Sequence, residues 1–295
     1  MNDCLDALLA RFPLQAGPTQ PLPLARGAIS LPMRQAPPYR GRLHLLLRGP
    51  LQIEGEGTDR ERLPREQWLQ PALIWLPGPG RQRLTPMSEQ GATVLDAEVD
   101  LGPPELTPLV DALPARLVLA RRDLPAPMAA TLALIVAEFE AGGSAHAAVM
   151  PRLVEVLLLQ WLRHRVELAR GTRAGLLAGL ADPALASVLD AIHRSPQQPW
   201  TLATLAQQAG LSRTALAARF TDTVGLPPGD YLIDWRLRCA RLALRQGLGV
   251  AEVAARVGYS SAAALTHVFS QRLGISPARW RRQQQAAAPV AHSAC

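Results

Sequence analysis

Two stretches of the sequence place polar side chains on helices in a pattern suited to contacts with nucleic acid. The first, GLSRTALAARF, occupies residues 210–220, and the second, GYSSAAALTHVF, occupies residues 258–269. At about 100° per residue, each stretch carries apolar side chains on one side and hydroxyl, imidazole or small groups on the other. Groups of these types contact base edges, and flanking arginines bind phosphate. The pattern predicts two DNA-contacting helices.

The outward positions of these helices are the predicted base contacts. They are Thr214, Ala217, Ala218, Thr221, Ala263, Thr266, His267, Ser270 and Gln271. Arginines beside these helices, or at the ends of neighbouring ones, are the predicted phosphate contacts: Arg213, Arg219, Arg236, Arg272, Arg281 and Arg282. Three further arginines are explained equally well as solvated side chains: Arg238, Arg241 and Arg245.

Both stretches belong to a longer repeat. Residues 202–212 match residues 250–260 at an offset of 48, and residues 216–231 match residues 265–280 at an offset of 49 after one inserted residue. Each copy has the order of a helix-turn-helix, in which the second helix enters the DNA major groove.

Local chemistry explains the order of each copy. Gly210 ends a short helix because glycine adopts a positive φ without steric cost, and Ser212 caps the next helix. The inward positions predicted to form the core are Leu216, Phe220, Leu265 and Phe269.

A connecting helix is predicted between the two copies. It begins at Pro228 and runs for about 18 residues, or about 27 Å. Such a helix can hold two recognition helices about 34 Å apart, which is one turn of DNA. Trp235, Cys239 and Trp280 stand at helical spacing among apolar residues and are predicted to be buried. Asp182 is the predicted N-cap of the first helix of this region.

Residues 182–283 resemble the DNA-binding domain of the AraC family of bacterial transcription regulators. The run VAEVAARVGYSSAAALTHVFSQRLGISPARWRR holds the most specific signature of that family. Upstream, LHLLLRGPLQI and WLQPALIWLPGP resemble strands of the cupin-type sensor barrel found in one subgroup. The resemblance implies a transcription activator that binds double-stranded promoter DNA. It also implies contact with RNA polymerase and formation of a homodimer.

Two positions depart from the family pattern. The family commonly has arginine at the positions of Ala218 and His267, and arginine paired with guanine is the commonest specific base contact. Strong guanine readout is therefore not expected. Small apolar groups on the first helix suit thymine methyl groups instead, and His267 can donate to a base or a phosphate.

The expected fold class is α+β with two domains, an N-terminal cupin-like β-barrel with flanking helices and a C-terminal all-α tandem helix-turn-helix domain. Short runs between turns predict strands over 24–101, and helical periodicity predicts helices over 128–140 and 149–169. The predicted divisions are a sensor barrel at 1–115, a helical dimerisation segment and linker at 116–180, the DNA-binding domain at 181–284 and a disordered tail at 285–295.

Charge and composition agree with a nucleic-acid partner. The net charge is +7 and all 31 basic residues are arginine. Residues 182–282 hold twelve arginines against six acidic residues, so nearly all of the excess lies there. The sequence has no apolar run of 18 residues and no signal peptide, which predicts a cytoplasmic protein with no membrane partner. Its three cysteines form no disulfide framework. Reaction of Cys4 with a partner or a second subunit is left as an alternative.

The N-terminal region offers little chemistry. His44 is the only histidine among the predicted strands, so no metal and no cofactor are expected. His44, Leu46 and Trp75 are the candidate pocket for a small-molecule effector, and a filled core that serves only dimerisation is an equal alternative. No enzyme activity is expected. Two rival functions remain, a non-specific architectural DNA binder and a cupin-type enzyme with a vestigial DNA-binding domain.

Overall fold

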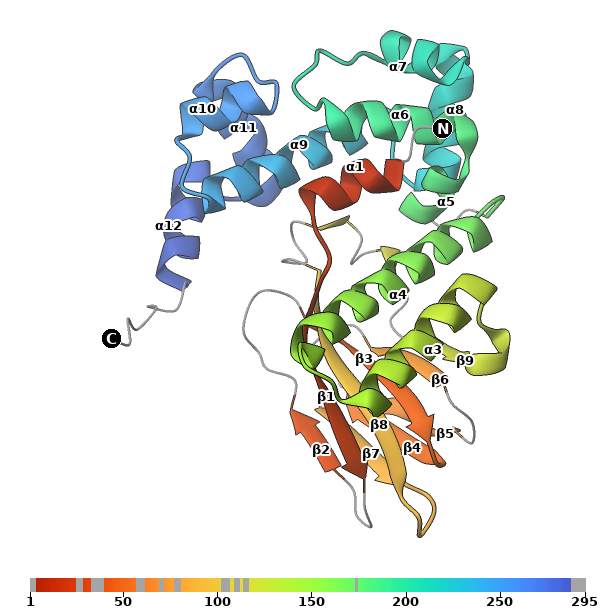
Figure 1. Cartoon of the computed structure of the whole chain (residues 1–295). Coiled ribbons are helices and arrows are strands. Elements are labelled where there is room, and N and C mark those ends of the chain that lie inside the picture. Colours follow the sequence, from red (N-terminus) through yellow and green to blue (C-terminus); the bar gives the residue numbers. More distant parts are fainter. Residues whose placement is uncertain are drawn as a thin grey trace. The chain divides into compact units, whose positions relative to one another are not determined.

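The structure is a computed structural model of the chain. It describes residues 4–24, 29–32, 40–56, 62–68, 72–76, 81–101, 107–108, 112–113, 117–172 and 175–287. Contacts divide the chain into two units (Figure 1). Residues 9–168 form a unit of strands with two long helices, and residues 169–295, with the start of the chain up to Leu8, form a helical unit.

Two antiparallel sheets build the first unit. The five-stranded sheet has the order β1 (Gln15–Leu24), β8 (Ala92–Asp100), β3 (Arg40–Arg48), β6 (Ala72–Leu76) and β9 (Leu117–Ala120). The four-stranded sheet has the order β2 (Ile29–Pro32), β7 (Arg81–Pro86), β4 (Leu51–Glu56) and β5 (Arg62–Trp68).

The strands extend beyond the predicted range of 24–101 at both ends. The sequence does not predict β1 as a strand because it contains Pro18, Pro21 and Pro23. Proline lacks a backbone N–H donor and usually argues against a strand. The three prolines are tolerated because β1 lies at the edge of its sheet and, among the described strands, pairs only with β8. β9 is only four residues long, too short for its alternation to stand out.

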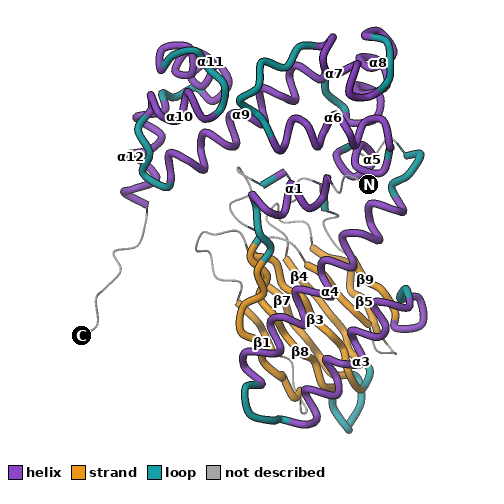
Figure 2. Tube along the Cα trace, turned by 45° about the horizontal axis from the view of Figure 1, so that its top comes forward, coloured by secondary structure: helices purple, strands orange, loops and turns teal. Residues whose placement is uncertain are grey.

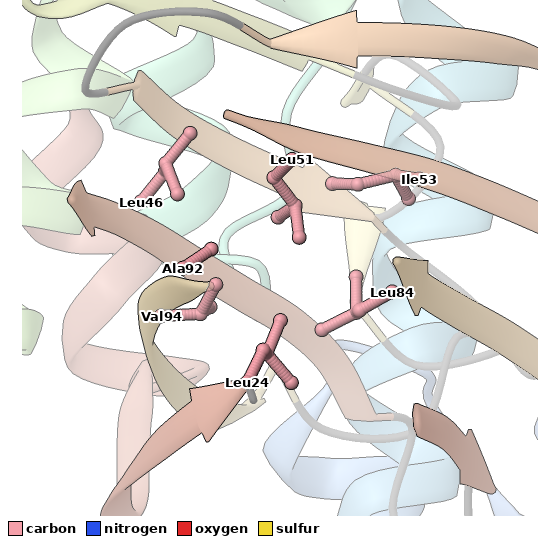
Figure 3. Packing of buried hydrophobic residues seen from close by; sticks show 7 residues of the cluster. All are labelled: Leu24, Leu46, Leu51, Ile53, Leu84, Ala92 and Val94. Carbon is pink, nitrogen blue, oxygen red and sulfur yellow. The ribbon is translucent and has the colours of Figure 1, made fainter. Parts of the chain in front are cut away.

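An apolar core lies between the two sheets (Figure 3). Leu46 of β3 and Val94 of β8 are register partners in one sheet, and Leu51 and Leu84 come from the other. Leu24, Ile53 and Ala92 complete the cluster. Because none of the seven is more than 6% exposed, this part of the interior is filled by side chains.

Helices α3 (Ala126–Ala141) and α4 (His146–Leu168) run across the outer face of the five-stranded sheet (Figures 1 and 2). A short 3-10 helix, η1 (Arg121–Asp123), leads into α3. Buried side chains line one face of each helix, among them Ile135 of α3 and Trp161 of α4. The carboxylate of Glu155 accepts a hydrogen bond from the backbone N–H of Ala16 at 3.0 Å, which ties α4 to β1.

The helical unit contains the repeat. Its helices are α5 (Leu176–Ala181), α6 (Pro183–Arg194), α7 (Leu202–Ala209), α8 (Arg213–Val224), α9 (Pro228–Arg245), α10 (Val250–Arg256), α11 (Ala262–Leu273) and α12 (Pro277–Ala287). The first part of α1 (Cys4–Arg11) also belongs to this unit. α9 has the predicted length of 18 residues and connects the two copies (Figure 2). The predicted disordered tail began at residue 285, but residues 285–287 belong to α12, and residues 288–295 lie outside the described part of the chain. Within the described part, no helix is long and apolar enough to cross a membrane.

The structure places a buried helix, α5, at the end of the segment 116–180, where the small residues of the sequence predicted a linker. All six residues of α5 are buried. A Cβ atom at Gly179 would lie 2.9 Å from Cγ2 of Val224 and 3.0 Å from Cδ1 of Leu189, so the small residue permits close packing of α5 against α6 and α8. The small residues in this stretch serve packing, which composition alone does not distinguish from flexibility.

Removal of a core aromatic ring tests the packing of the second copy. Phe269 has no exposed surface, and its ring meets that of Trp280 edge to face with centroids 6.4 Å apart. We expect Phe269→Ala to lower the free energy of unfolding by about 3–5 kcal/mol, because it leaves a cavity. Urea unfolding followed by tryptophan fluorescence measures this loss. The half-exposed Leu226 provides the control Leu226→Ala, and an equal loss in the two variants would contradict the assignment of Phe269 to the core.

Candidate nucleic-acid interface

The first helix-turn-helix consists of α7 and α8. Thr201 and Thr204 form a capping box at the start of α7. Gly210 follows α7 with a φ of 63°, and the hydroxyl of Ser212 accepts a hydrogen bond from the N–H of Ala215 at 3.1 Å. These two local predictions are confirmed.

The second helix-turn-helix consists of α10 and α11 and uses the same devices. Gly258 has a φ of 83°. The cap of α11 is Ser261, whose hydroxyl accepts a hydrogen bond from the N–H of Ala264 at 3.1 Å. Ser260, the residue that matches Ser212 at an offset of 48, is not the cap. The inserted residue therefore lies before the cap, and Ser261 matches Ser212 at the later offset of 49.

Each recognition helix is fixed by the predicted core. The four inward residues, Leu216, Phe220, Leu265 and Phe269, have no exposed surface. The ring of Phe220 meets that of Tyr231 edge to face, with centroids 5.6 Å apart. Trp235, Cys239 and Trp280 are also buried, as predicted.

The predicted base contacts lie on the open side of α8 and α11. Six are exposed and three are half-buried; the half-buried ones are Ala217, Thr266 and Ser270. The hydroxyl of Thr266 donates to the carbonyl oxygen of Ala262 at 2.7 Å, so its methyl group is the part left for an apolar contact. The imidazole of His267 is exposed on α11.

The six arginines predicted to contact phosphate fall into two groups. Arg213 and Arg282 are both exposed, and neither has an ion-pair partner among the described residues. The other four are engaged within the helical unit. In α8, Nη2 of Arg219 lies 2.7 Å from Oδ2 of Asp182. In α11, Arg272 pairs with Asp230, and this hydrogen bond raises the pKa of Arg272.

Arg281 and Arg236 bind backbone carbonyl groups. Nη1 of Arg281 donates to the carbonyl oxygen of Leu248 at 3.3 Å. Arg236, on α9, donates from Nε to Pro196 and from Nη2 to Gln198, both at 2.8 Å. Desolvation by burial lowers the pKa of Arg236.

Sequence patterns did not reveal the acidic partners. Asp182 was predicted as the N-cap of α6, and its Oδ1 indeed accepts from Ala184 at 3.0 Å and from Leu185 at 3.2 Å. Its second oxygen binds Arg219 of α8, which is 37 residues away. Asp230 follows the same pattern, since it lies in the first turn of α9 and binds Arg272. An acidic residue in a first turn signals only the local function, because the distant arginine is supplied by the tertiary fold.

The side chains of two of the three candidate pocket residues, His44 and Leu46, are described, and they have different surroundings. Leu46 belongs to the filled core between the sheets, and the side chain of Trp75 lies outside the described residues. His44 is fully buried with Nδ1 2.9 Å from Oδ1 of Asp96. Arg42 pairs with Oδ2 of the same Asp96 at 3.0 Å. Positions 42, 44 and 46 share one face of their strand, so this ion-paired group lies on the inner face of the sheet.

The described residues contain no group of three or more histidine, cysteine or acidic side chains able to hold a metal ion. Cys239 is buried. The side chain of Cys4 lies outside the described residues.

Comparisons with known proteins agree with this architecture. Residues 3–167 match the family model described as a cupin, and residues 205–283 match the model described as a helix-turn-helix domain. An AraC-like transcription regulator from Streptomyces antibioticus is 44% identical over 135 residues, which cover 45% of each chain. The transcriptional regulator AlkR from Acinetobacter baylyi is 33% identical over 136 residues, covering 46% of this chain and 44% of the relative.

One solved structure is similar to part of the chain. The DNA-binding domain of AdpA, determined with a target DNA, is 34% identical over 37% of this chain and 98% of that chain, with a TM-score of 0.35. The matched regions of the two relatives above span less than half of each relative's length. The chain belongs to the cupin family. Its residues 205–283 match a helix-turn-helix domain, and it is similar to AraC-like transcription regulators over slightly less than half of its length.

The pair of Asp182 with Arg219 makes a testable prediction. Asp182→Asn keeps the N-cap, because asparagine caps as well as aspartate, and removes the charge that holds Arg219. We expect the freed arginine to bind phosphate, so the slope of log K against log salt for duplex DNA should steepen by about 0.9. Asp222→Asn, an exposed position on α8, changes the net charge equally and is the control. An equal change in both variants would mean that net charge alone is responsible.

Proposed function

We propose that the chain is a transcription regulator that binds promoter DNA sequence-specifically through α8 and α11. The observation that carries the proposal is the repeated construction of these helices. Each follows a glycine with positive φ, begins at a serine cap, buries a leucine and a phenylalanine, and leaves its opposite side open. The names of the AraC-like relatives support the same function.

The proposal assigns roles to the parts of the chain. Residues 181–284 bind DNA, residues 1–115 form a sensor, and residues 116–180 form a dimerisation segment. Activation by contact with RNA polymerase belongs to the proposal and rests on the family resemblance. The chain acts without enzyme activity, and stoichiometric iron, manganese or zinc in the purified protein would favour the cupin-type enzyme instead.

A small-molecule effector is a further part of the proposal. Packing around Leu46 supports the filled-core alternative at that end of the barrel. A polar effector would have to bind at the ion-paired group of Arg42, His44 and Asp96, where it would replace one partner of an existing pair.

Homodimer formation is supported by exposed apolar side chains on α3 and α4. Leu134 is 58% exposed, Val156 is 43% exposed and Leu159 is 37% exposed. Val156 and Leu159 are three residues apart on α4 and therefore share a face. Burial of this face against a second copy would remove apolar surface from water.

DNA binding is tested with the fragment upstream of the chain's own gene and a shuffled fragment, across a salt series. We expect a preference of about 10³ or more at physiological salt, the range of specific regulators. His267→Ala should reduce this preference by about tenfold, because base contacts specify. Arg282→Gln should weaken both fragments equally and reduce the salt slope by about 0.9. If the unaltered protein binds both fragments equally, and also shows no preference among duplexes selected from a library, the non-specific architectural DNA binder is favoured.

The dimer is tested by sedimentation equilibrium. The double variant Val156→Glu, Leu159→Glu should be monomeric at concentrations at which the unaltered chain is dimeric, because charge at the interface is costly to desolvate. The control is Met87→Glu, which places the same charge at a 39% exposed residue after β7. A dimer that persists in the double variant would show that another surface mediates association.

A further inference from the structure

The second helix-turn-helix meets the loop that leads into the first one, beside the helix that connects the two copies. The turn between α10 and α11 meets the loop between α6 and α7 at Gly258. A Cβ atom at this position would lie 2.7 Å from the carbonyl oxygen and 2.8 Å from Cα of Gln197. Gly258 also has a positive φ, so a side chain there would be strained as well as crowded. Glycine is therefore required by a close approach as well as by the turn.

Arg236 joins both copies to the connecting helix. From α9, its guanidinium donates two hydrogen bonds to the loop of the first copy, to the carbonyl oxygens of Pro196 and Gln198. The same group lies over the ring of Tyr259 in the second copy, 5.6 Å from the ring centroid. One side chain thus contacts three elements at the same point, and the planar guanidinium is well suited to such a combination of hydrogen bonds and stacking.

The loop of the first copy is itself held in place. The N–H of Gln198 donates to the carbonyl oxygen of Ser195 at 3.1 Å, and Nε1 of Trp200 donates to the same oxygen at 2.9 Å. The N–H of Trp200 donates to the carbonyl oxygen of Gln198 at 2.7 Å. Because the loop is internally bonded, a contact at Gln197 transmits to α6 and α7 rather than being absorbed by loop movement.

We propose that Arg236 and Gly258 form a junction that fixes the separation and rotation of α8 relative to α11, and thereby sets the length of DNA between the two recognised boxes. Arg236 is then a positioning residue and not a phosphate contact. The inference rests on the proposed function, since it requires that both helices bind DNA. Two of the guanidinium nitrogens are directed at backbone carbonyls, whereas a phosphate contact requires donors that face solvent.

The test measures how affinity depends on the spacing of the boxes. Selection from a random duplex library with the full chain defines the two boxes, and probes with one base pair added or removed between them follow. A single base pair rotates one box by about 35° around the duplex, so the unaltered chain should lose at least about tenfold in affinity. Arg236→Gln and Gly258→Ala should bind the best spacing several-fold more weakly and lose only about threefold on the altered probes.

Matched controls separate the junction from charge and from backbone strain. Arg245→Gln removes the same charge from an exposed position of α9. Gly274→Ala changes a glycine with a similar φ of 73°, where an added Cβ atom would meet nothing within 4 Å. Both controls should keep the spacing penalty of the unaltered chain. Arg236→Lys keeps the charge without the two-point geometry and should behave like Arg236→Gln.

A measurement without DNA makes the test independent of the operator. Spin labels at Gln207→Cys on α7 and Ala251→Cys on α10, with the native cysteines replaced by alanine, report the distance between the copies. Gly258→Ala should broaden this distance distribution and Gly274→Ala should not.

The outcomes distinguish the inference from the proposed function. An unchanged spacing penalty in Arg236→Gln, with a salt slope reduced by about 0.9, would overturn the inference and make Arg236 a phosphate contact. An unchanged distance distribution in Gly258→Ala would overturn it as well. If the unaltered chain selects no sequence from the library, the proposed function fails, while the distance measurement still decides whether the junction holds the two copies.

Discussion

The helical unit depends on one helix that takes part in two separate cores. α9 contacts α6 and α8 at one end of the unit and α10 and α12 at the other. Near its start, Tyr231 packs against Phe220 and shares a 2.7 Å hydrogen bond with His193. Further along, Ala240 and Leu244 are fully buried. Because α9 packs against α8 of the first copy and against α10 and α12 around the second, neither copy can move without disturbing the helix on which the other depends.

The arginines of this unit have two kinds of partner, carboxylates at the surface and groups inside the fold. Asp182 and Asp230 each lie at the start of a helix and hold an arginine of a recognition helix. Such ion pairs at the surface contribute little to folding and can exchange with phosphate at modest cost. Arg236 differs, because its partners are carbonyl groups and an aromatic ring. The positive charge of Arg236 is therefore used within the fold, whereas Arg219 and Arg272 can exchange their carboxylate partners for a polyanion.

The barrel combines two kinds of interior on one face of its sheet. Leu46 and Val94 meet the opposite sheet in a filled apolar core. Two residues along the same strands, Asp96 lies 2.9 Å from the ring of its register partner His44 and forms a buried ion pair with Arg42. Breaking such a pair by removing one partner leaves an uncompensated buried charge, which is strongly destabilising. Any signal received at this place acts on a group that the fold must keep paired.

The sequence by itself determined the elements of the helix-turn-helix part. Glycine, serine cap and the leucine and phenylalanine one turn apart are local signals, and they located α8, α11 and the buried face of each. β1 was missed because its prolines disguise an edge strand, and α5 was mistaken for a linker because small residues serve packing as well as flexibility. Only the tertiary structure decided what the arginines bind. Arg219 meets Asp182 and Arg236 meets Pro196 across 37 and 40 residues, and a partner at such a separation is set by how helices pack, which no local pattern encodes.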